Sequence, residues 1–255
     1  MQRPFMLSSV YLRLATRVLV VMVALMMILS WWMNGPIPQD RLYHEFADQR
    51  NFLGIDHAVD VLSNSVFCVA GISGIYLTRV GCRQLRRFTN LYLTFFIAVT
   101  LTAFGSAYYH YDPDNTTLVW DRLPMSVGFT SILAAIIAER INLKLGQQLF
   151  APLVTAGICS VLYWQWQDDL RPYFLVQFGT LLTLPLLLLL YRRPGSHYLW
   201  LGIAFYVLAK VLEVYDTQVY TLTSSWVSGH TLKHLSAGVT PLLIAMKIAD
   251  ETRYR

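Results

Sequence analysis

Long apolar stretches separated by short polar loops dominate this chain. A helix needs about 20 residues to cross about 30 Å of hydrocarbon. Eight stretches approach or reach that length, at residues 17–33, 57–77, 88–109, 123–138, 150–166, 172–191, 198–214 and 230–248. The remaining residues form short loops and tails that leave no room for a soluble domain. The pattern therefore predicts an all-α polytopic transmembrane helix bundle.

The composition supports a membrane protein. Hydrophobic residues make up 55% of the chain and charged residues only 14%, whereas soluble proteins have about 25% charged residues. These figures exclude a disordered chain, a secreted disulfide scaffold and an ordinary cytosolic enzyme. The three cysteines, Cys68, Cys82 and Cys159, form no closely spaced pair. The sequence therefore predicts neither a disulfide framework nor a thiolate metal site.

The basic residues are sorted between the two sides of the predicted membrane. With the N-terminus placed in the cytoplasm, fourteen of the 20 Lys and Arg residues fall on the cytoplasmic side. Four fall on the other side: Arg41, Arg50, Arg122 and Arg171. This bias follows the positive-inside rule and predicts that both termini are cytoplasmic. It also accounts for the net charge of +5, so no nucleic-acid partner is expected, and no obligate protein partner is evident.

Three polar motifs lie at the non-cytoplasmic ends of the predicted helices. Ser106 and His110 are four residues apart at the end of the third stretch, and Asp121 opens the fourth. His230 and His234 open the eighth stretch and share one helical face. Ionisable residues at the membrane are costly. Their gathering on one side therefore indicates a functional site there.

The histidines suggest a metal site. The His230–His234 spacing can hold one metal from a single helical turn, as in the HExxH motif of zinc proteases, although the central Glu is absent here. His110 is the natural third ligand because its helix ends on the same side. Three histidines leave zinc one open position for a catalytic water. Asp121 can accept a proton from that water, and Ser106 can donate to an oxyanion. In a membrane helix the same histidine pair can instead ligate haem or form interhelical hydrogen bonds.

Taken in order, these residues resemble the alkaline ceramidase family. They also resemble its wider superfamily, which includes progestin/adiponectin-type receptors and Per1-type proteins. The shared pattern is Ser-x-x-x-His, then an Asp, then a late His-x-x-x-His, and the upstream Ser63-Asn64 matches as well. The segments FADQRNFLGIDHAVDVLSN, GSAYYHYDPDNTTLVWDRLP and WVSGHTLKH are similar to those of a bacterial ceramidase-like branch. The resemblance covers about residues 43–248.

The resemblance implies seven core helices around a zinc site in residues 35–255. An extra transmembrane helix and a cytoplasmic tail would precede them in residues 1–34. His110, His230 and His234 would hold zinc, Asp121 would activate water, and Ser106 would assist the carbonyl. The implied reaction is hydrolysis of the amide bond of ceramide or a related N-acyl lipid. The protein would lie in a bacterial inner membrane, with the site on the non-cytoplasmic side.

Two other functions fit the same residues. One is a receptor-like or lipid-remodelling member of the superfamily without ceramidase activity. The other is a haem- or quinone-binding membrane protein that uses the three histidines as ligands. Eukaryotic ceramidases of the family also bind calcium through an acidic N-terminal segment. The corresponding region here contains the oxygen-bearing residues Asp48, Asn51, Asp56 and Asp60. Calcium is therefore a second candidate cofactor, with its ligands unassigned.

Charged residues also occur inside the predicted helices. Lys210 and Glu213 lie three residues apart in the seventh stretch, and the spacing predicts a structural ion pair within the bundle. Lys233 lies between the two late histidines. We expect it on a different helical face from both, extended to the membrane interface rather than bound to an acidic head group.

Overall fold

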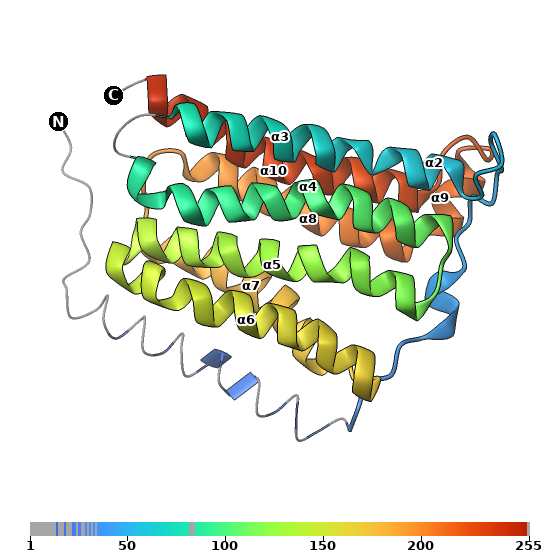
Figure 1. The fold of residues 1–255 in the computed structure, drawn as a ribbon, viewed down its shortest axis with the longest axis horizontal. Coiled ribbons are helices and arrows are strands. Elements are labelled where there is room, and N and C mark those ends of the chain that lie inside the picture. Colours follow the sequence, from blue (N-terminus) through green and yellow to red (C-terminus); the bar gives the residue numbers. More distant parts are fainter. Residues whose placement is uncertain are drawn as a thin grey trace.

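The computed structural model describes residues 35–81 and 85–253, together with isolated positions between 14 and 33. Its long elements in those ranges are all α-helices (Figure 1), which confirms the all-α prediction. The predicted first span, 17–33, lies largely outside the described residues. The helices are α2 (Ala58–Ser63), α3 (Ser65–Val80), α4 (Thr89–Tyr111), α5 (Asn115–Arg140), α6 (Leu143–Gln167), α7 (Arg171–Leu190), α8 (Ser196–Val214), α9 (Asp216–Leu222) and α10 (Gly229–Arg253), with short 3-10 helices η1 (Arg41–His44) and η2 (Leu85–Phe88).

The long helices have the dimensions of membrane spans. Within the described residues, six helical units are long and apolar enough to cross a membrane: α2 with α3, then α4, α5, α6, α7 and α8. Helix α10 is as long as these units but carries more charge, and it runs beside α3 along the bundle (Figure 1). Together the seven units form one bundle, as expected for an integral membrane protein.

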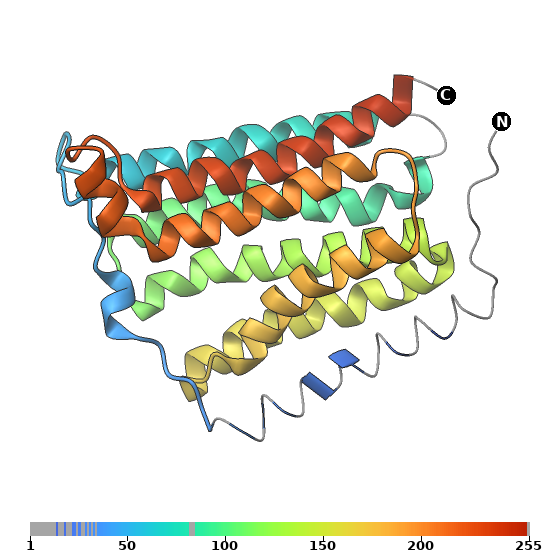
Figure 2. The same ribbon diagram turned by 180° about the vertical axis from the view of Figure 1, so that it is seen from behind.

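Each end of the bundle has its own set of loops. The loops that follow α4, α6 and α8 lie at one end, which we call the histidine end because it carries His110 and His230. Residues 35–57, blue in Figure 2, run across the helix termini at this end. The loops that follow α3, α5 and α7 lie at the other end, which we call the arginine end because it carries Arg140 and Arg193.

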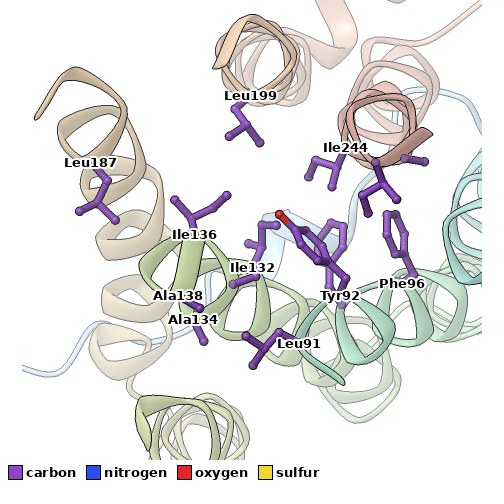
Figure 3. Close-up of a cluster of buried hydrophobic side chains, with 14 of the residues drawn as sticks. Leu91, Tyr92, Phe96, Ile132, Ala134, Ile136, Ala138, Leu187, Leu199 and Ile244 are labelled. Carbon is purple, nitrogen blue, oxygen red and sulfur yellow. The ribbon is translucent and has the colours of Figure 1, made fainter. Parts of the chain in front are cut away.

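A dense apolar core fills the bundle toward the arginine end. Side chains from α4, α5, α7, α8 and α10 meet there (Figure 3), with Phe96, Ile136 and Leu187 fully buried. Close packing of this kind makes any loss of volume costly. The core therefore anchors the helices whose opposite ends carry the histidines.

Helix α5 begins earlier than the apolar pattern predicts. Its first residue is 115 rather than 123, because Asp114 caps the helix. The Asp114 carboxylate accepts a hydrogen bond from the Thr117 backbone N–H at 2.6 Å, and the Thr117 hydroxyl accepts one from the Asp114 N–H at 3.1 Å. The polar residues of this first segment conceal it from a hydropathy pattern. Asp121 therefore lies inside the helix instead of opening it, which corrects the sequence prediction.

Helices α4 and α5 approach each other closely beside Asp121. Pro124 has no N–H, so the Trp120 carbonyl lacks its usual helical donor. Gly105 of α4 lies directly against this carbonyl, and a Cβ at Gly105 would be only 2.0 Å from the Trp120 oxygen. The glycine and the proline together bring Ser106 of α4 next to Asp121 of α5.

Candidate metal centre

The three predicted histidines meet at one point. His110 lies in the last turn of α4, and His230 and His234 lie in the first two turns of α10. The Nε2 atom of His110 is 3.2 Å from the Nε2 atoms of both His230 and His234. All three residues are buried, and in the described part of the chain they form a group that could hold a metal ion.

The tautomer of His234 is set by a serine from α2. The Ser63 hydroxyl donates its proton to the Asp60 carbonyl oxygen at 2.8 Å, and its oxygen lies 2.7 Å from His234 Nδ1. A hydroxyl has one proton, so Ser63 must accept from a protonated Nδ1. The Nε2 atom of His234 then carries a lone pair directed at the other two rings, as metal-binding histidines require.

His230 also presents a lone pair at Nε2. The Lys233 ammonium is 3.0 Å from that atom and can only donate, so a metal ion bound there would replace Lys233 as the partner of this lone pair. His110 Nε2 lies between two acceptors, while its Nδ1 is buried without a hydrogen-bond partner. Converging lone pairs repel one another unless a proton or a cation lies between them. The centre is therefore chemically suited to a cation.

The spacing also fits a particular geometry. Zinc binds histidine nitrogens at about 2.0–2.1 Å with tetrahedral angles, which places two ligand nitrogens about 3.3 Å apart. The two Nε2–Nε2 separations of 3.2 Å from His110 match that value. The same spacing leaves no room for a porphyrin between the rings, which argues against a haem held by two of these histidines.

A second group of residues supports the histidines from outside. Asp60 accepts hydrogen bonds at Oδ1 from Thr231 Oγ1 at 2.6 Å and from Ser228 Oγ at 3.2 Å, which fixes the start of α10 against α2. Phe46, from the segment that crosses the helix ends, packs edge-on against the rings of His110 and His230 with centroids 4.6 and 4.7 Å away. These contacts hold the rings in place and shield them from the loop side.

Asp121 and Ser106 lie together beside the histidines. Both side chains are buried. Both face a cavity of about 430 Å³, which His234 also lines. The structure therefore brings all five predicted site residues to one region of the bundle. It also places Ser63 and Asn64, the upstream match, at the end of α2 behind His234.

The lysine between the histidines differs from its prediction. Lys233 is turned inward, where its ammonium contacts Glu213 Oε1 at 3.0 Å and His230 Nε2 at 3.0 Å. Lys210 forms the predicted ion pair with the other oxygen of Glu213. The largely buried Glu213 carboxylate draws Lys233 into the bundle and away from the membrane interface, because a charge in a low-dielectric region needs a partner.

The candidate calcium residues are directed toward different partners. Arg50 donates to Asp48 through Nε at 2.8 Å, and Asn51 donates to Asp56 at 2.8 Å. Burial alone would raise the pKa of the Asp48 carboxyl, but the hydrogen bonds from Arg50 outweigh it and hold that pKa below its ordinary value. In the described ranges these residues form no cluster like that of the histidines. The donor set therefore gives calcium no support.

Several contributors to the site could not be read from the sequence. Asp60, Phe46 and Glu213 reach it from three separate elements. Asp60 and Glu213 are acidic residues inside apolar stretches, which is a signal that the sequence does carry, whereas Phe46 gives none. The chain matches no model of a known protein family and no curated protein. The resemblance to the ceramidases therefore rests on the motifs themselves.

Proposed function

We propose that this protein is a zinc-dependent membrane hydrolase that cleaves the amide bond of ceramide or a related N-acyl lipid. The observation that carries the proposal is the convergence of His110, His230 and His234 at 3.2 Å spacing beside a cavity that also contains Asp121 and Ser106. Three histidines are the ligand set of catalytic zinc sites, which keep one position open.

The side chains around the centre have separate tasks in this proposal. Zinc held by the three histidines supplies a Lewis acid that polarises a carbonyl and makes water nucleophilic near neutral pH. Asp121 accepts the proton from water and returns it to the departing amine nitrogen. Ser106 donates a hydrogen bond to the carbonyl oxygen, where negative charge develops. The amide bond breaks with addition of water, giving a fatty acid and an amine.

The shape of the interior suits an acyl chain. The cavity beside Asp121 extends past Phe95, Phe129, Tyr206 and Thr240, and these residues also line a second, largely apolar cavity of about 90 Å³. The second cavity is lined mainly by α7 and α8, and Ile132, Leu199 and Ile244 of its lining belong to the core shown in Figure 3. A polar reactive end joined to an apolar extension matches a lipid amide, whose head group is polar and whose chain is not.

The distribution of charge supports an orientation for this activity. Arg140, Arg193 and Lys247 lie at or near the arginine end, which the positive-inside rule assigns to the cytoplasm. The histidine end then lies on the non-cytoplasmic side of a bacterial inner membrane. A lipid in the outer half of that membrane would reach the cavity without crossing the bilayer.

A second candidate is a receptor-like or lipid-remodelling protein built on the same bundle. The presence of Asp121 and Ser106 beside the histidines favours hydrolysis, because binding alone requires neither a base nor an oxyanion donor. The two functions are separated by turnover. Purified wild-type protein should release fatty acid from N-acyl lipids, and His230→Ala should release none. Mass spectrometry measures the fatty acid. A zinc-loaded wild-type protein that releases no fatty acid from any N-acyl lipid would contradict the proposal.

A further inference from the structure

One cation in the cavity wall has an unused donor. Arg122 follows Asp121 on α5 and is only 4% exposed. Its Nη2 donates to Gln39 Oε1 at 2.7 Å, but its Nη1 is buried and has no hydrogen-bond partner. A buried unsatisfied donor on a charged group is costly. Arg122 lines the same cavity as Asp121, so this donor is available to a ligand there.

Aromatic rings hold Arg122 in position. Its guanidinium carbon lies 4.2 Å from the ring centroid of Trp164, 5.0 Å from that of Tyr173 and 5.4 Å from that of Tyr43. Such contacts fix the plane of the guanidinium and stabilise its charge. The fork geometry of arginine is preorganised for bidentate contact with a carboxylate or a phosphate.

Two lysines extend this positive wall. Lys210 and Lys233 share the single carboxylate of Glu213, and both line the cavity. Tyr43 connects them to the arginine, because its hydroxyl donates to Glu213 Oε1 at 3.1 Å while its ring contacts Arg122. An ammonium has three donors, so each lysine keeps at least one for a ligand.

Among the charged side chains of the cavity lining that are buried or half-buried, positive charges outnumber negative ones. Arg122, Lys210 and Lys233 face the buried carboxylate of Asp121 and that of Glu213, whose side chain is 12% exposed. The other acidic residue of the lining, Asp40, is exposed and uses its carboxylate to cap η1 at 2.9 Å. A neutral head group such as that of ceramide would leave this surplus, and the free Nη1 donor, without a partner.

Building on the proposed hydrolase function, we propose that the preferred substrate carries a carboxylate on its head group, as an N-acyl amino acid does. Arg122 binds this carboxylate, with Lys210 and Lys233 nearby. In an N-acyl amino acid the carboxylate is one carbon from the amide nitrogen, so binding it places the scissile bond close to Asp121, the residue before Arg122. Hydrolysis then adds water across the C–N bond and releases a fatty acid and a free amino acid.

The test compares lipids of one acyl chain length that differ in head-group charge. N-palmitoylglycine is anionic, and N-palmitoylethanolamine is its neutral counterpart of nearly equal size. We expect kcat/KM for the glycine lipid to exceed that for the ethanolamine lipid at least ~10-fold, a difference of ~1.4 kcal/mol. Arg122→Gln should reduce the ratio to about 1 by raising KM for the glycine lipid, and Arg122→Lys should restore part of it.

Lys210→Met provides an independent variant if Arg122→Gln does not fold. Its side chain is 32% exposed, and Glu213 keeps Lys233 as a partner. We expect this variant to lower the preference for the anionic lipid several-fold. An unchanged preference in both variants would overturn the proposed carboxylate site.

Direct binding separates this inference from the proposed function. Both lipids are titrated into purified wild-type protein, once with zinc bound and once after chelation of the zinc. If the carboxylate bound only to zinc, the glycine lipid would lose its higher affinity once the metal is removed. A preference for the glycine lipid that survives chelation and disappears in Arg122→Gln supports the carboxylate site even if no lipid is hydrolysed. Equal binding and equal hydrolysis of the two lipids would overturn the carboxylate site and leave the hydrolase standing.

Discussion

Helix α10 carries two lysine–glutamate clusters that use the same chemistry in different surroundings. Lys247, near the arginine end, contacts Glu139 at 2.9 and 3.0 Å and Glu251 at 3.1 Å, and its side chain is 1% exposed. Lys233 lies 14 residues earlier, about 21 Å along the helix, and faces a cavity with an 18% exposed side chain.

The two clusters differ in whether the lysine donors are all used within the protein, and this distinguishes a structural buried charge from a functional one. Lys247 satisfies its donors within the protein, and neither described cavity reaches it. Lys233 shares its carboxylate with Lys210 and contacts a metal-ligand candidate. A closed network contributes to one native arrangement, whereas an open one retains donors for a ligand.

The largest expected effect on stability is at the closed cluster, formed by Lys247, Glu139 and Glu251. Lys247→Met leaves the buried Glu139 carboxylate uncompensated and should lower the free energy of unfolding by about 3–5 kcal/mol. Thermal unfolding in detergent measures the loss, and the zinc bound per folded chain should not change. Adding Glu139→Gln to this variant should recover much of the stability. A Lys247→Met protein as stable as wild type would show that the closed cluster contributes nothing.

A substitution of Asp121 at the histidine end should affect turnover rather than stability. Asp121→Asn preserves the shape of the side chain but removes the base, so kcat should fall by about 10²–10⁴-fold. Zinc content should stay at the wild-type value because Asp121 is not a ligand in this account. Initial rates on an N-acyl lipid, with metal analysis of the same sample, provide the measurement. Full turnover by the variant would remove Asp121 from the mechanism.

A smaller effect is expected where the helices approach. Gly105→Ala forces α4 and α5 apart at the Trp120 carbonyl and should destabilise the protein by about 1–3 kcal/mol, with reduced turnover because Ser106 and Asp121 separate. Gly128→Ala is the matched control on α5, since its new Cβ would lie 3.9 Å from the Ala98 Cβ, an ordinary van der Waals contact. Similar melting temperatures for the two variants would contradict the close approach.

The smallest effect is expected at the Tyr43 hydroxyl. It connects the open cluster, formed by Lys210, Lys233 and Glu213, to Arg122. Tyr43→Phe removes one hydrogen bond to Glu213 and should cost about 0.5–1.5 kcal/mol. The ring remains against Arg122, so the preference for an anionic lipid should persist. Chemical denaturation measures the stability. A loss as large as that of Lys247→Met would show that the open cluster is also essential for folding.

The sequence predicted most of the fold because hydrophobic length determines membrane helices directly. It located α3 to α8 and α10 from apolar stretches alone, and it missed the first turns of α5 because Asp114 and Thr117 extend the helix through polar side chains. The short helix α9 was missed for a related reason: seven residues with no buried side chain carry no hydropathy signal.

The site was only partly predictable. The i, i+4 spacing of His230 and His234, and of Ser106 and His110, identifies shared helical faces, and the structure confirms that the three histidines meet. Lys233 was misplaced because its partner Glu213 comes from another helix. Contacts between helices depend on packing, which one chain's periodicity does not specify. The ceramidase-like activity stays a prediction.

The central claim is that the three histidines hold one zinc ion. Elemental analysis of purified wild-type protein, of His230→Ala and of His197→Ala tests it most directly. His197 is exposed near the start of α8 at the arginine end, so its variant is the matched control. We predict about one zinc per chain in the wild type and in His197→Ala, and a large loss in folded His230→Ala. Equal zinc in all three proteins, or none in the wild type after supply of zinc, would contradict the account.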